Sequence, residues 1–170
     1  MNKKIPKTTA QALGWLKRMG IEVTRAKCDA RIYEFEYNDI LMLITIDSDN
    51  DNELSLNAPV FLTGKSDEKN KEIFETAKYM TSDTLKDFIV EYVHKELSYV
   101  GQTYVRPKHV RILRRYQLVH MLDQIRDAHD TFLLSTLIAA APPEAWLGEA
   151  AGAGSGEAVA GTAGGVGEEA

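Results

Sequence analysis

The chain has 170 residues and a formal net charge of −5, from 20 lysines and arginines and 25 aspartates and glutamates. This length is enough for one domain with a substantial core. All 20 basic residues and 20 of the acidic ones lie in residues 1–141, and the other five acids lie in residues 142–170. The overall charge therefore gives no reason to expect a polyanionic partner, although a local basic patch could bind one.

Cysteine usage and hydropathy exclude further classes of protein. Cys28 is the only cysteine, which rules out an intramolecular disulfide and a zinc site built from several cysteines of one chain. No apolar run approaches the length of a membrane span, and the basic start of the sequence is not followed by the apolar core of a signal peptide. We therefore expect a cytoplasmic protein with no membrane partner.

The N-terminal part predicts a flexible leader over residues 1–7 and then a helix. Thr8, with Gln11 three residues later, matches a capping box, and apolar residues follow at helical spacing until Gly20. Residues 21–27 alternate in polarity, which is typical of a strand.

Residues 31–47, RIYEFEYNDILMLITID, predict a β-hairpin. Aromatic residues alternate with glutamates in its first half, and Asn38-Asp39 tolerates the positive φ of a two-residue turn. With this turn the register puts six residues on one apolar face: Tyr37 opposite Ile40, Phe35 opposite Met42, and Tyr33 opposite Ile44. Because an isolated hairpin is seldom stable, helices or further strands must cover that face.

The opposite face of the hairpin holds the first candidate site. Leu41 and Leu43 point to that side together with Glu34 and Glu36, and Ile32 extends the apolar surface. Two interpretations remain open: a second layer of the fold covers these residues, or they form an exposed patch that binds a partner.

The middle of the chain predicts a strand and a second helix. Residues 47–53 match the start of a calcium loop but lack its later glycine and glutamate, so we predict a solvated hairpin tip. A strand follows from Glu53 to about Asn57, where Pro59 is expected to interrupt the ladder. Ser66 predicts the N-cap of a helix that ends near Thr81.

Residues 85–97 fit either a helical face or a strand. The run FIVEYV, residues 88–93, is almost entirely β-branched and aromatic, and it can pair with residues 98–105 across the tripeptide at 94–96. We therefore predict two strands in this region.

A long final helix is expected from Pro107 to about Ala140. Beyond it, residues 142–170 are rich in glycine, alanine and glutamate, which predicts a disordered tail. The predicted fold class is thus α+β, with an antiparallel sheet of five or six strands and three helices in a single domain over residues 8–141.

The strongest charge cluster is residues 106–115, RPKHVRILRR. It contains no acid and five cations: Arg106, Lys108, Arg111, Arg114 and Arg115. Cations at a helix N-terminus oppose the helix dipole, so this arrangement needs compensation. Glutamates of the sheet, the acidic tail and an external anion such as nucleic acid are the alternatives.

No motif indicates catalysis. The four histidines do not form the close pairs that metal sites use, and no nucleophile elbow frames a serine. His129 lies in the apolar stripe of the final helix, where we expect a hydrogen-bonded core histidine. We therefore expect no catalytic, cofactor-binding or metal-binding site.

The order of the predicted elements, together with the hairpin EFEYNDILMLITID, resembles the YbjN-like family of bacterial sensory transduction regulators. The fold of that family is similar to that of type III secretion chaperones. The resemblance covers about residues 8–140. It implies a non-enzymatic, often dimeric module that binds other proteins, and it supplies no catalytic residues to carry over.

Our first hypothesis is therefore a protein-interaction module, chaperone-like or regulatory, that binds another protein, a peptide or a second copy through Ile32, Leu41 and Leu43. The alternative hypothesis is nucleic-acid binding through residues 106–115.

Overall fold

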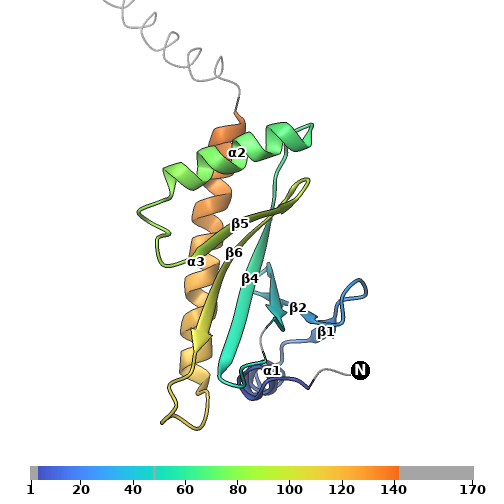
Figure 1. Cartoon of the computed structure of the whole chain (residues 1–170), viewed down its shortest axis with the longest axis vertical. Coiled ribbons are helices and arrows are strands. Elements are labelled where there is room, and N and C mark those ends of the chain that lie inside the picture. Colours follow the sequence, from blue (N-terminus) through green and yellow to red (C-terminus); the bar gives the residue numbers. More distant parts are fainter. Residues whose placement is uncertain (1–3, 48, 142–170) are drawn as a thin grey trace, which may run out of the picture. The chain divides into compact units, whose positions relative to one another are not determined.

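The computed structural model describes residues 4–47 and 49–141. In this part of the chain it has three helices and a six-stranded antiparallel sheet, which confirms the predicted α+β class (Figure 1). The elements are α1 (Lys7–Arg18), β1 (Val23–Arg25), β2 (Ile32–Tyr37), β3 (Ile40–Thr45), β4 (Glu53–Phe61), α2 (Asp67–Met80), β5 (Ile89–His94), β6 (Leu97–Val105) and α3 (Arg115–Ala140).

The described residues up to Ala139 form one compact unit, and of residues 140–170 the structure describes Ala140 and Ala141. The predicted tail over residues 142–170 and the first three residues of the predicted leader lie outside the described part of the chain. None of the described helices is long and apolar enough to cross a membrane.

The sheet has the strand order β1-β2-β3-β4-β6-β5, and the β2–β3 hairpin lies near one edge. Its turn residues Asn38 and Asp39 have φ values of 48° and 65°, as the two-residue turn requires. The three predicted pairs, Tyr37 with Ile40, Phe35 with Met42 and Tyr33 with Ile44, are all present. The hairpin prediction is confirmed in both turn and register.

All three helices pack on the face of the sheet that carries these aromatic residues. Leu16 of α1 and Leu122 of α3 are fully buried in one core with Phe35 and Met42. Toward the other end of α3, the ring of Phe74 from α2 lies 5.8 Å from that of Phe132 and 5.6 Å from that of Tyr92 on β5. Figure 1 accordingly shows α2 crossing α3 near the C-terminal end of that helix.

Two further predictions are confirmed. Ser66 is the N-cap of α2, and its side chain accepts a hydrogen bond from the backbone N–H of Lys69. Residues 89–105 form two antiparallel strands, with Lys95 at positive φ in the connecting turn.

Pro59 does not end the fourth strand as predicted, because β4 continues to Phe61. Pro59 pairs with Tyr99 of β6, while β3 pairs with β4 only as far as Asn57. The backbone nitrogen of Pro59, which has no hydrogen to donate, therefore faces no neighbouring strand, and no ladder hydrogen bond is lost. The carbonyl of Pro59 accepts a hydrogen bond from Nε2 of His129 at 3.2 Å, which confirms the hydrogen-bonded histidine.

The predicted capping box on α1 is wrong. Pro6 is the N-cap residue and provides no side-chain hydrogen bond. The Thr8 hydroxyl donates to the Asp51 carbonyl, and the Gln11 side chain reaches residues 106–113. The first strand is also shorter than predicted, since β1 spans only Val23–Arg25.

The predicted start of the last helix at Pro107 is wrong as well, because α3 begins at Arg115. Residues 106–114 form an irregular segment whose backbone groups bind the side chains of other elements. The carbonyl of Leu113 accepts from Nε1 of Trp15 at 2.7 Å, and its N–H donates to Oε1 of Gln11 at 2.7 Å. These contacts replace the hydrogen bonds of a first helical turn.

We predict that Gly101→Ala destabilises the fold by about 1–3 kcal/mol, because overpacking forces neighbouring atoms to shift. A Cβ atom at this position would lie 2.0 Å from Oδ1 of Asn57 and 2.8 Å from the carbonyl oxygen of Leu56. Urea unfolding measures the change. Gly14→Ala is the matched control: nothing lies within 4 Å of its added carbon, so it should be neutral or stabilising.

Tyr37 gives an expected pH dependence. Its hydroxyl donates to Oδ1 of Asp123 at 2.6 Å. Two causes raise the pKa of Tyr37 from 10.0 to about 12: burial, which is the larger, and the hydrogen bond to the Asp123 carboxylate. The folded state therefore holds the phenolic proton more tightly than the unfolded chain. This contribution to stability is fully present below pH 10 and is lost as the pH rises toward 12.

We thus expect Tyr37→Phe to lose less stability than wild type when urea unfolding at about pH 9 is compared with about pH 11.5. The exposed Tyr79 supplies the control, since Tyr79→Phe should follow wild type. Parallel losses in all three proteins would contradict this assignment.

Candidate functional site: the open face of the sheet

The face of the sheet that points away from the helical core is here called the open face. Strand side chains alternate between the two faces, and paired residues share a face. The register from β2 to β5 therefore identifies its members. One row across it consists of Glu34, Leu43, Asn57, Gly101 and Ile89.

Large apolar side chains are exposed on this face. Leu41 is 39% exposed, Phe61 56%, Ile89 53% and Val105 57%. They lie on β3, β4, β5 and β6, and the described helices build the core on the other side. Apolar residues that share one uncovered sheet face form a surface suited to a partner.

The three residues predicted for the interface differ in exposure. Leu41 is exposed and Ile32 is half-buried, whereas Leu43 is only 5% exposed. Leu43 lies between Glu34 and Asn57 in the row across the face. It therefore forms part of the floor of the open face, while Leu41 stands at its surface.

The centre of the open face is polar and closely packed. The Asn57 amide donates to Oγ1 of Thr45 at 3.3 Å, and its Oδ1 occupies the space that a side chain at position 101 would need. Gly101 is required here because the Asn57 side chain lies directly over its Cα.

Tyr99 is a half-buried member of the open face and pairs with Pro59 and Glu91. Burial raises the pKa of Tyr99, and nearby Cys28 and Glu34 raise it further. Glu34 is on β2, which is three strand spacings, or about 14 Å, from β6 in a flat sheet. Both residues belong to the open face by register, so the Glu34 carboxylate acts on the Tyr99 phenol from the same side of the sheet.

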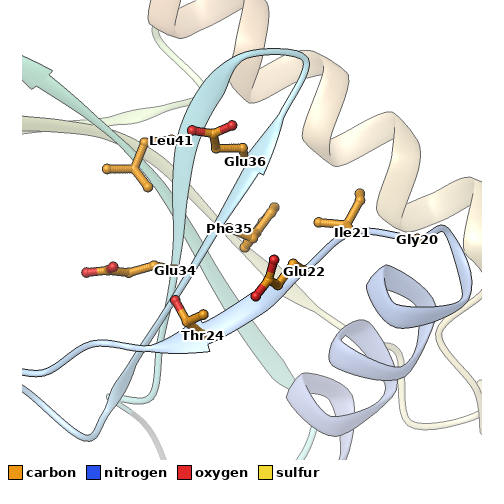
Figure 2. Close-up of a pocket in the computed structure, with 8 residues that line it drawn as sticks. All are labelled: Gly20, Ile21, Glu22, Thr24, Glu34, Phe35, Glu36 and Leu41. Atoms are coloured by element: carbon orange, nitrogen blue, oxygen red, sulfur yellow. The ribbon is translucent and has the colours of Figure 1, made fainter.

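A hollow of about 500 Å³ lies beside the hairpin at the β1 edge (Figure 2). Its lining residues come from β1, the hairpin and the link after α1: Gly20, Ile21, Glu22, Thr24, Glu34, Phe35, Glu36 and Leu41. Figure 2 shows the carboxylates of Glu22, Glu34 and Glu36 around this hollow, with Leu41 beside them. The hollow thus combines apolar surface with three negative charges.

The charges on the open face have one sign. The strands place Glu34, Glu36, Glu53 and Glu91 there, and Glu22 joins them at the hollow. The same register places no lysine or arginine of β1 to β6 on this face. Sequence reasoning found the two hairpin glutamates but not the others, because it did not predict the strand order.

The predicted basic segment divides into one buried and four exposed cations. Arg106 is only 6% exposed and donates to Gln11 at 3.1 Å, to Asn52 at 2.9 Å and to the Arg111 carbonyl. The other four, Lys108, Arg111, Arg114 and Arg115, are exposed, and no salt bridge in the described part of the chain involves them. Arg106 is therefore occupied by the fold itself.

The structure also places the residues that could bind a metal or act as a nucleophile. Within residues 4–47 and 49–141, no group of three or more histidine, cysteine, aspartate or glutamate side chains is placed to hold a metal ion. Cys28 is exposed in the loop between β1 and β2.

Comparison with known proteins supports the fold. No protein-family model and no curated protein matches the sequence. Among solved structures, YbjN from E. coli is 11% identical with a TM-score of 0.50, over 74% of this chain and 88% of YbjN. An uncharacterized protein from Methanothermobacter thermautotrophicus is 14% identical with a TM-score of 0.45, over 78% of this chain and 93% of that protein. The similarity to YbjN shows a YbjN-like fold, and membership of its family stays a prediction.

We predict that Arg106→Met destabilises the protein by about 2–4 kcal/mol, because it leaves half-buried acceptors on Gln11 and Asn52 without their charged donor. Arg114→Met should stay within about 0.5 kcal/mol of wild type, since that side chain is exposed. Equal unfolding free energies for the two variants would show that Arg106 is not a structural arginine.

Proposed function

We propose that this chain is a non-enzymatic protein-interaction module, regulatory or chaperone-like, that binds another protein on the open face of its sheet. The observation that carries the proposal is that Leu41, Phe61, Ile89 and Val105 are exposed on one face of the sheet, which no described helix covers. Phe61 and Val105 lie at opposite ends of the β4–β6 ladder, so these residues offer several apolar contact points along the face to one partner.

The YbjN-like fold supports this assignment, because YbjN is described as a proposed transcription regulator. A regulatory protein acts by binding other macromolecules. Leu41 and Ile32 keep the role predicted from the sequence. Leu43 is buried beneath the surface of the face, and Phe61, Ile89 and Val105 extend the proposed contact surface.

Nucleic-acid binding through residues 106–115 is the second candidate. Four exposed cations without salt bridges in the described part of the chain favour it. Its test is a mobility-shift assay with DNA and RNA at low salt, where a complex that dissociates steeply with added salt would support it. The absence of any shift would leave the protein interface as the function.

We predict that a triple variant, Leu41→Ser, Phe61→Ser and Ile89→Ser, retains at least tenfold less of the partner protein that the wild-type chain captures from native lysate. The reason is that a few buried apolar contacts supply most of the binding energy of an interface. Quantitative pull-down measures the retained protein, and light scattering shows whether the partner is a second copy of this chain.

The control carries three serines at exposed apolar positions of the helices: Tyr79→Ser, Leu134→Ser and Leu137→Ser. It should retain the partner as wild type does. Circular dichroism verifies that both variants are folded. A partner that the open-face variant still retains in full would rule out this face.

A further inference from the structure

We propose that the partner presents to the open face an amphipathic helix whose apolar stripe is flanked by lysines or arginines. This inference rests on the proposed function and names the chemistry of the partner. It follows from the one-signed charge of the open face, from the acidic hollow beside Leu41 and from the shape of the face.

The charge of the open face does not follow from composition. Residues 1–141 contain equal numbers of basic and acidic residues, yet the charged strand residues on this face are Glu34, Glu36, Glu53 and Glu91. Arg25 lies on the covered face, where it pairs with Tyr33 in the sheet register and its guanidinium stacks 5.0 Å from that ring. A partner that buries the open face must therefore neutralise carboxylates.

Arg31, in the loop that precedes β2, does not supply that neutralisation. Arg31 lies 2.9 Å from Asp29 within the same loop, and its hydrogen bonds lower the pKa of the Asp29 carboxyl to about 2. Arg31 is thus held by its own neighbour. The carboxylates of Glu34 and Glu36 have no salt bridge within the described residues and remain available to a cation from outside.

The hollow fits long basic side chains. It places Glu22, Glu34 and Glu36 around Leu41, Phe35 and Ile21. Lysine and arginine bury their aliphatic stems on apolar surface while the charged end reaches a carboxylate. A short polar side chain would use only half of this lining. A cation on an apolar stem uses both halves.

The shape of the face favours a helix as its occupant. A helix that runs across the strands spans the three spacings from β3 to β5, about 14 Å, in about ten residues, and helices already cover the other face of the same sheet. The exposed residues Leu41, Phe61 and Ile89 lie on three different strands. An extended segment added at one edge would reach only the strands nearest to it, whereas a helix across the face can contact all three.

The test uses two labelled 18-residue peptides with leucine at one helical stripe, one with lysine and one with glutamate at the remaining positions. Fluorescence anisotropy with the full chain at low salt measures their binding. We expect the lysine peptide to bind and the glutamate peptide to bind at least tenfold more weakly. Added salt should weaken the lysine peptide.

Matched variants locate the site. Glu22→Gln, Glu34→Gln and Glu36→Gln together should weaken the lysine peptide by about tenfold, as three exposed ion pairs are removed. Glu68→Gln, Glu72→Gln and Glu75→Gln on the exposed side of α2 change the net charge equally and should leave binding within about twofold.

Equal weakening by both glutamine variants, or equal binding of both peptides, would overturn the inference. If the lysine peptide fails to bind while the open-face serine variant still loses its natural partner, the interface stands and the basic helix is wrong. The wild-type chain could instead form a salt-sensitive dimer that the first glutamine variant abolishes. That result would overturn the inference, because the occupant of the open face would then be a second copy of this chain, with its exposed Ile112 and the neighbouring cations.

Discussion

The register of the β2–β3 hairpin is the constraint on which both faces of the sheet depend. Because side chains alternate along a strand, a shift of one residue would bring Glu34 and Glu36 into the core and expose the aromatic residues. The two-residue turn, with positive φ at Asn38 and Asp39, prevents that shift. β1 and β4 each pair with one strand of this hairpin. The same turn therefore decides which residues build the core and which remain on the open face.

A second constraint joins segments that are distant in the sequence. Arg106 at the end of β6 binds Gln11 of α1 and Asn52 before β4, and Gln11 also accepts from the backbone of Leu113. A buried charge is costly unless hydrogen bonds satisfy it, and here neutral oxygens accept from both terminal nitrogens of Arg106, while its Nε has no partner among the described residues. Because these bonds fix the backbone of residues 106–114, the final helix begins only at Arg115.

Local patterns predicted what local physics determines, namely the hairpin, the Ser66 cap and the two strands over residues 89–105. Pro59 was misjudged because its effect depends on which strand lies beside it, and Pro107 because the burial of its neighbour Arg106 is not visible in a basic run. For the candidate site, the alternation along the hairpin predicted that Leu41 shares one face with Glu34 and Glu36. Phe61 and Ile89 were missed because only the strand order, with β6 between β4 and β5, brings them onto the same face.

An apolar sheet face without cover tends to promote self-association, and the distribution of glutamates addresses this problem. Two copies that stacked open face to open face would oppose carboxylates such as Glu34 and Glu91, which is unfavourable once water is excluded. A polyanion is repelled for the same reason. A partner that brings cations gains both the apolar contact and the charge pairing. Under the proposed function, the carboxylates that disfavour self-association of this face are therefore the same groups that would select a basic partner.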